Sequence, residues 1–251
     1  METLLEIIGL SISYQTKKQE IQAINNISFS LLKGEFLAII GKSGCGKTSI
    51  LSAISNLIPY IGKINFYADG KLKNSPPIIG YMLQRDELFP WLTIKQNACL
   101  PLKIQNNYTK ERVKFVDELL EKYGLSSFKN SYPNELSGGM RQRAALIRTL
   151  AVEPDLLLLD EPFSALDSQT RISVCDDVYS IIKKENKTAI LVTHDISEAI
   201  SVADKIIVLT ERPANILNTH IINLNKELCP LKRREERGFA PLFEKLWGEL
   251  H

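Results

Sequence analysis

Residues 36–57 contain the feature that most constrains the fold of this chain. The octapeptide in this segment matches the pattern Gly-x4-Gly-Lys-Thr in full, as Gly41-Lys42-Ser43-Gly44-Cys45-Gly46-Lys47-Thr48. An apolar run, Phe36–Ile40, precedes it, and residues 48–57 have the composition of a helix. A glycine loop between a strand and a helix lets backbone amides converge on phosphate oxygens. The pattern therefore predicts an α/β protein that binds phosphate groups, and a merely structural glycine turn is the weaker alternative.

The side chains that end this loop have the chemistry that a nucleotide triphosphate requires. The Lys47 ammonium is expected to reach the β and γ phosphates, and the Thr48 hydroxyl is expected to ligate Mg²⁺. Ser49 comes next on the same helix and is included in the predicted ATP-binding set. Because the backbone binds the phosphates, we expect the Cys45 side chain to be incidental.

A second apolar run delivers two carboxylates. Leu156, Leu157, Leu158 and Leu159 are followed directly by Asp160 and Glu161. The carboxyl end of a strand is where α/β sheets place their ligands. Asp160 suits a Mg²⁺ partner, and Glu161 suits a general base that orients and polarises an attacking water. An acidic pair at a strand end is weak by itself, because such residues often finish strands at a surface.

The remaining apolar segments alternate with helical ones, as in a sheet covered by helices. Buried parallel strands are predicted at 78–83, 189–192 and 206–209, and a smaller antiparallel sheet is predicted from 4–10, 27–31 and 63–67. Between Gln84 and Leu136 the apolar residues change to helical spacing. Thr109 and Ser137 are predicted amino-terminal caps there, and Gly124 is predicted to end a helix.

Composition limits the classes of partner. The chain has 251 residues, 44% of them hydrophobic, and 31 Lys and Arg stand against 29 Asp and Glu. A net charge of +2 gives no electrostatic case for nucleic acid or an anionic membrane. Four scattered cysteines predict reduced thiols, and no apolar run approaches the roughly 18 residues of a spanning helix. Glu2 and Glu6 stand where a signal peptide has basic residues, so we expect a cytosolic setting.

One further motif distinguishes this chain from other proteins with a phosphate loop. Leu136-Ser137-Gly138-Gly139-Met140-Arg141-Gln142-Arg143 resembles the signature of ATP-binding-cassette ATPases. The other motifs follow the order of that family, with Gln84 after a strand, then Asp160 and Glu161, then Ser164-Ala165-Leu166-Asp167, then His194. The resemblance implies a P-loop NTPase with a RecA-like parallel core, a small antiparallel β subdomain and a helical subdomain inserted at about 85–153. We expect the ATPase domain to cover 1–230 and an amphipathic helical tail to cover 231–251.

The resemblance also implies a role for each motif residue. Gln84 would contact Mg²⁺ and the attacking water, His194 the γ phosphate, and Tyr14 would stack on adenine. Ser137, Gly138 and Gly139 would bind the ATP held by an opposing subunit, and Asp167 would join the two sites. Taken singly, residues like Gln84, His194 and Tyr14 are more often surface or structural residues, and a Ser-capped helix after a glycine turn is the weaker alternative for Ser137. Since the chain contains one set of motifs, we expect it to act as a dimer, with itself or with a relative.

Length favours one branch of the family. Residues 84–137 have no room for the long coiled coil of chromosome proteins, and the chain has neither a second cassette nor a fused membrane domain. An importer ATPase remains, and Pro90-Trp91-Leu92-Thr93 resembles the ATPases of nitrate, sulfonate and taurine importers. Expected partners are membrane permease subunits at the cytoplasmic face and, indirectly, a solute-binding protein. The alternative is a soluble ATPase switch acting on nucleic acid or ribosomes, although no nucleic-acid partner is expected from the charge.

Two apolar surfaces have competing interpretations. Phe89, Trp91 and Leu92 could form a groove for a short helix of a membrane subunit, or Trp91 could pack inside the helical subdomain. In the tail, residues 239–250 have an apolar helical stripe, for which packing on the chain's own core is favoured over a partner contact. The charged run 232–237 before it is predicted to be a solvated face.

Overall fold

The structure is a computed structural model, and it describes residues 2–15 and 19–250. Its internal contacts divide the chain into two compact units. The first unit joins residues 1–77 to residues 186–251, and the second consists of residues 78–185. Segments far apart in sequence therefore build the first unit.

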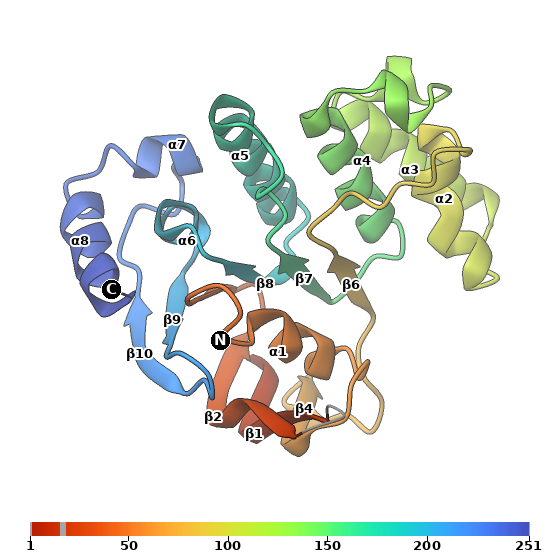
Figure 1. Ribbon diagram of the computed structural model, residues 1–251. Coiled ribbons are helices and arrows are strands. Elements are labelled where there is room, and N and C mark those ends of the chain that lie inside the picture. Colours follow the sequence, from red (N-terminus) through yellow and green to blue (C-terminus); the bar gives the residue numbers. More distant parts are fainter. Residues whose placement is uncertain (1, 16–18, 251) are drawn as a thin grey trace. The chain divides into compact units, whose positions relative to one another are not determined.

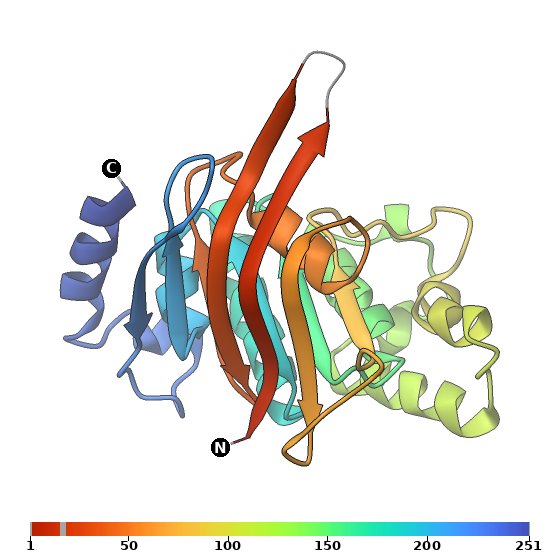
Figure 2. The same ribbon diagram turned by 90° about the horizontal axis from the view of Figure 1, so that it is seen from below.

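An antiparallel sheet begins the first unit, as predicted. Its strands are β1 (Thr3–Gln15), β2 (Glu20–Leu32), β4 (Ile61–Ala68) and β5 (Lys71–Leu72), in the order β2-β1-β4-β5. Leu5 and Ile7 are buried while Glu6 between them is not, which is the alternation of a strand with one face on a core. Figure 2 shows β1 and β2 as two long neighbouring strands.

The parallel strands of the first unit surround β3 (Phe36–Ile40). This strand pairs in parallel with β8 (Thr188–Thr193) on one side and with β9 (Lys205–Leu209) on the other. Every residue of β3 and β8 is buried, as expected of parallel strands covered on both faces. The sequence does not predict β10 (Ile216–Ile221), which pairs antiparallel with β9.

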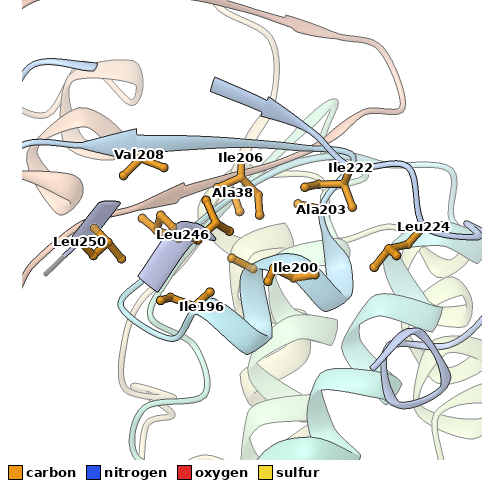
Figure 3. Packing of buried hydrophobic residues seen from close by; sticks show 12 residues of the cluster. Ala38, Ile196, Ile200, Ala203, Ile206, Val208, Ile222, Leu224, Leu246 and Leu250 are labelled. Carbon is orange, nitrogen blue, oxygen red and sulfur yellow. The ribbon is translucent and has the colours of Figure 1, made fainter. Parts of the chain in front are cut away.

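Helices cover the strands of the first unit. They are α1 (Lys47–Ile54), α6 (Ile196–Val202), α7 (Pro230–Arg233) and α8 (Phe239–Leu250). Leu246 and Leu250 of α8 join the buried cluster that β3, β9 and α6 form (Figure 3). The favoured interpretation of the tail, packing on the chain's own core, is thus confirmed.

The charged run before α8 differs from its prediction. Arg233 is only 1% exposed, whereas Lys232, Glu235 and Arg237 are exposed as predicted. The Arg233 guanidinium donates to the carbonyl oxygens of Asn225 at 3.1 Å and Ser201 at 3.0 Å. The prediction of a wholly solvated face is therefore wrong, because backbone carbonyls of two other segments supply the polar partners that a buried cation requires.

The second unit combines two parallel strands with helices. Its strands β6 (Ile79–Met82) and β7 (Leu156–Asp160) are paired, and the helices α2 (Ile94–Ile104), α3 (Lys110–Lys122), α4 (Gly138–Leu150) and α5 (Ser168–Lys184) belong to it (Figure 1). Two short 3-10 helices, η1 (Ser126–Phe128) and η2 (Pro133–Glu135), join α3 to α4. The predicted Thr109 cap is confirmed, and Gly124 with a φ of 73° follows the last turn of α3.

Trp91 lies outside the packed interior of this unit. Its side chain is 68% exposed, and its ring meets that of Phe89 with centroids 5.2 Å apart. Packing of Trp91 inside the helical subdomain is therefore wrong. The predicted limits at residues 85, 153 and 230 stay predictions, and the terminal residues of the predicted segments, Met1 and His251, lie outside the described residues.

Candidate active site

The phosphate loop lies between β3 and α1, as predicted. Gly46, the residue before α1, has a φ of 122°, a conformation that side chains other than glycine rarely adopt. A Cβ atom there would also lie 2.7 Å from Ile24 Cδ1 of β2. Both facts require glycine at this position, so the loop reaches the first turn of α1 only with this residue.

Lys47 is held against the loop that precedes it. Its ammonium donates to the carbonyl oxygens of Gly41 at 2.9 Å and Lys42 at 3.1 Å, and the residue is 5% exposed. Lys42, Ser43, Gly44 and Thr48 are exposed. The loop therefore places one cation beside its backbone and presents most of its outer residues to solvent, as a phosphate site requires.

Cys45 is the exception within the loop, because its side chain points inward. The residue is 2% exposed, and a Cβ on Gly41 would lie 2.8 Å from its Sγ atom. Burial raises the pKa of the Cys45 thiol, although Lys47 opposes this. The side chain fills space beneath the loop, and its incidental role in phosphate binding stays a prediction.

Tyr14 contacts the start of α1. It lies on β1, and its hydroxyl donates to Ser49 Oγ at 2.8 Å. The tyrosine is 41% exposed. An aromatic ring that is partly open and tied to the turn after the phosphate loop is suited to a base attached to the phosphates, and adenine stacking stays a prediction.

His194 leaves the sheet beside the phosphate loop. In the pairing of β3 with β8, Ile40 lies opposite Thr193, so Gly41 and His194 follow neighbouring strands at the same edge. His194 is exposed. The first unit thus brings together the phosphate loop, Tyr14 with Ser49, and His194.

Gln84 and Glu161 come together in the second unit. Met82 of β6 lies opposite Leu159 of β7, so the segments that follow these two parallel strands begin at the same edge of the sheet. Gln84 Nε2 donates to Glu161 Oε2 at 3.4 Å and to Ser164 Oγ at 3.2 Å. Ser164 donates in turn to the Glu161 carbonyl oxygen at 2.9 Å. Three side chains from two loops therefore form one hydrogen-bonded group.

The two carboxylates at the carboxyl end of β7 have different surroundings. Asp160 is 6% exposed, and its Oδ2 accepts from the Tyr81 hydroxyl at 3.3 Å. Glu161 is partly exposed and has a φ of 44°, in the left-handed region. The backbone turn thus separates a carboxylate anchored within the protein from one that reaches outward.

The Leu-Ser-Gly-Gly segment begins α4. Ser137 is exposed and caps the helix, because its Oγ accepts from the Met140 amide at 3.3 Å, as predicted. Gly139 is buried, and a Cβ there would lie 2.7 Å from Val174 Cγ2 of α5. Gly138 is partly buried between these two residues. The helix therefore starts with small residues at a close approach and an exposed hydroxyl.

Asp167 has a local role that the sequence analysis does not assign. It caps α5, where its carboxylate accepts from the Thr170 amide at 3.1 Å. Hydrogen bonds from Thr170 hold the pKa of Asp167 below its usual value. An Asp directly before a helical segment is a recognisable capping signal. Tyr81 and Ser164 have no such signal, since a tyrosine in a strand and a serine in a turn are ordinary.

Comparison with known proteins decides the family. The ABC transporter family model matches residues 24–164, which include the phosphate loop, the signature segment and both carboxylates. The chain belongs to the ABC transporter family. Predictions of its fold class and of ATP hydrolysis are confirmed.

Two relatives match this ABC protein over most of their length. The ABC transporter ATP-binding protein YtlC of Bacillus subtilis is 44% identical, over 99% of this chain and 96% of YtlC. The nitrate import ATP-binding protein NrtD of a Synechocystis strain is 37% identical, over 98% of this chain and 93% of NrtD. Both relatives are named as ATP-binding proteins, and this chain is likewise the ATP-binding part of an ABC system.

A solved structure matches the fold. The dimeric cassette MJ0796, in a post-hydrolysis state with ADP and phosphate, is 29% identical with a TM-score of 0.72, over 88% of this chain and 99% of that one. Among the described residues of the ABC protein, no helix is long and apolar enough to cross a membrane.

Proposed function

We propose that this chain is the ATP-hydrolysing subunit of a membrane importer for a small solute. The observation that supports this most is the phosphate loop between β3 and α1, with Lys47 held over its carbonyl oxygens, in a member of the ABC family. In this role residues 41–49 bind the phosphates of ATP, Tyr14 stacks on adenine, and His194 contacts the γ phosphate.

Mg²⁺ is the proposed metal. Among the described residues, no group of three His, Cys, Asp or Glu side chains could hold a metal alone. Mg²⁺ does not need one, because it is commonly held by one or two carboxylates together with phosphate oxygens and waters. Thr48, Gln84 and Asp160 offer the oxygen donors that this cation prefers. When bound, the metal would neutralise charge that develops on the phosphate oxygens.

Glu161 is the proposed general base. Its carboxylate would accept the proton of the attacking water, and the hydrogen bond from Gln84 at 3.4 Å would orient it. Gln84 also bonds to Ser164, so a turn of the glutamine side chain alters the surroundings of Glu161. This link supports the predicted role of Gln84 in reporting the nucleotide state.

Two chains are proposed to form the working unit. The exposed hydroxyl of Ser137 stands at the amino terminus of a helix of 13 residues, a position suited to an anion. The same chain already has a phosphate loop, so Ser137, Gly138 and Gly139 would serve ATP held by a second copy, and Asp167 would lie near the junction. The dimeric state of the solved relative supports this arrangement.

The partner in the membrane is proposed to dock beside Gln84. Phe89 and Trp91 expose 38% and 68% of their surfaces. A cavity of about 340 Å³ lies next to this segment, between residues 85–88, the start of α4, and Leu166. In its lining, the buried Gln142 Oε1 has no hydrogen-bond partner among the described residues. A short helix of a permease subunit could cover the aromatic pair and donate to this oxygen, which would attach the chain to the cytoplasmic face.

A small anion is the proposed cargo. The Pro90-Trp91-Leu92-Thr93 segment resembles ATPases of nitrate, sulfonate and taurine importers, and NrtD is named for nitrate import. A separate solute-binding protein would select the compound. Uptake of labelled nitrate and taurine by cells with the intact or the Lys47→Ala chain tests this, and uptake that does not depend on Lys47 contradicts it.

The experiment for the ATPase role uses Glu161→Gln, which keeps shape and removes charge. We expect phosphate release to fall about 100-fold or more while ATP binding persists, with an ATP-dependent dimer in size-exclusion chromatography. Glu121→Gln, an exposed change on α3, is the matched control. Turnover retained at the wild-type rate would refute the role of Glu161. Turnover that is stimulated by nucleic acid and not by membrane subunits would refute the importer.

A further inference from the structure

The loop between β9 and β10 touches the phosphate loop at two points. Lys42 Nζ lies 2.6 Å from Glu211 Oε1, and Arg212 Nη2 donates to the carbonyl oxygen of Gly44. None of the sequence motifs includes residues 210–215. Figure 2 shows this loop, in blue, beside the orange segment that leaves β3.

Residues 210–215 are anchored to β2. The Ala214 amide donates to the Ala23 carbonyl and the Asn25 amide donates to the Ala214 carbonyl, both at 2.9 Å. Asn25 Nδ2 also donates to Asn215 Oδ1 at 3.2 Å. Thr210 and Asn215 close the loop, since the Asn215 amide donates to Thr210 Oγ1 at 2.9 Å. Arg212 is therefore presented from a framework with several hydrogen bonds.

Strands β2 and β9, which flank the 210–215 loop, also lie against the phosphate loop. A Cβ on Gly46 would meet Ile24 of β2 at 2.7 Å, and a Cβ on Gly41 would meet Leu209 Cβ, at the end of β9, at 3.2 Å. Strands β2 and β9 thus lie under the phosphate loop and also hold the 210–215 loop. Motion of Arg212 relative to Gly44 is limited by this shared support.

The direction of the Gly44 carbonyl determines the orientation of one peptide group of the phosphate loop. This carbonyl shares a peptide plane with the Cys45 amide, and Gly44 has a φ of 78° that few other residues adopt. The Cys45 amide donates to the Lys42 carbonyl at 3.2 Å, so this peptide is held at both ends when Arg212 binds the carbonyl. Phosphate loops bind through the direction of successive amides, and fixing one peptide restricts its neighbours.

Glu211 adds a weaker restraint. Lys42 and Glu211 side chains are 48% and 72% exposed, so their ion pair is screened by water. The hydrogen bond from Lys42 holds the pKa of Glu211 below its usual value. Arg212 therefore holds the backbone, while Glu211 restrains only a side chain.

We propose that Arg212 is a positioning residue for the phosphate loop. By binding the Gly44 carbonyl it fixes the Gly44–Cys45 peptide, and through it the direction of the neighbouring amides of the loop, which bind the phosphates of ATP. The inference rests on the proposed function, in which residues 41–48 hold the phosphates of ATP. Arg212 contributes to ATP affinity through loop geometry, and simple attraction of a cation to phosphate is the competing explanation.

Calorimetric titration of ATP with Mg²⁺ into the purified full chain tests the proposal. We expect Arg212→Ala to raise the dissociation constant roughly three- to tenfold, as for loss of one charge-assisted hydrogen bond at an exposed site. Arg212→Lys keeps a cationic donor and should restore part of the affinity. In steady-state turnover, KM should rise while kcat stays near the wild-type value.

Salt dependence distinguishes an effect of Arg212 on loop geometry from simple attraction between its cation and the phosphates. Titrations at 0.05 and 0.5 M NaCl are compared, because about 0.5 M salt screens attraction between exposed charges. The loss in Arg212→Ala should persist at high salt, and Arg237→Ala, which removes an exposed cation from the tail, should bind ATP like wild type.

Wild-type affinity in Arg212→Ala, or a loss that vanishes at high salt, overturns the inference alone. A wild-type chain that binds no ATP overturns the proposed function and the inference with it. Should Arg212→Ala fail to fold, Arg212→Lys and Arg212→Gln supply the same comparison, and wild-type affinity in both overturns the role.

Discussion

Substitution of Leu246 in α8 tests most directly whether the tail packs on the core. The Leu246 side chain is 0% exposed in a cluster with Ile196, Ile200, Ile206 and Val208. Leu246→Ala removes three carbon atoms from this cluster. At about 0.8 kcal/mol per buried carbon the transfer cost is about 2.4 kcal/mol.

A cavity term adds to that cost. The surrounding residues belong to β9 and α6, which the sheet holds in place, so the site can collapse only where α8 itself moves. Leucine-to-alanine changes in cores cost about 2–5 kcal/mol, and we expect about 3 kcal/mol here. For a chain of this size, that lowers the melting temperature by about 6–12 °C.

Urea unfolding followed by Trp247 fluorescence measures this cost. The chain has two tryptophans, and a Trp91→Phe background leaves Trp247 of α8 as the reporter. Leu57→Ala is the matched control, because Leu57 is 66% exposed and loses the same atoms. A cost below about 0.5 kcal/mol for Leu246→Ala, equal to that of the control, would refute the packing argument.

A substitution and a chemical modification test two buried groups, the Arg233 guanidinium and the Cys45 thiol. Arg233→Ala should lower the free energy of unfolding by at least about 2 kcal/mol, because two carbonyl oxygens lose a charged donor; Arg237→Ala should stay within about 0.5 kcal/mol, and equal urea midpoints would contradict the role of Arg233. The pKa of the Cys45 thiol is higher in the folded than in the unfolded chain. The contribution of Cys45 to the free energy of unfolding is therefore full below the unfolded thiol pKa of about 8.5, and it is lost as the pH rises through the pKa of the folded chain. Alkylation with iodoacetamide at pH 8, followed by mass spectrometry, should modify Cys45 more slowly than the partly exposed Cys229, and equal rates would show that Cys45 is not protected.

The strands of the core could be predicted because their own residues are almost all apolar, which indicates burial. β3, β7 and β8 are continuous apolar runs, and the phosphate loop follows β3 with a pattern that few other structures accept. β10 could not be predicted in this way. Leu217 and Ile221 in it are 44% and 65% exposed, and polar residues separate them, so pairing with β9 determines the strand rather than its own composition.

The candidate site was predictable to the extent that its residues belong to motifs with fixed spacing. The sequence by itself determined the phosphate loop, the carboxylates Asp160 and Glu161, and the capped helix at Ser137, because each depends on residues adjacent in the chain. Contacts across the chain required the tertiary structure. The hydrogen bonds from Gln84 to Glu161, from Arg212 to Gly44 and from Arg233 to Ser201 join residues 32 to 168 positions apart. Only folding brings such donors and acceptors together, since no local pattern encodes which distant carbonyl or carboxylate a side chain will meet.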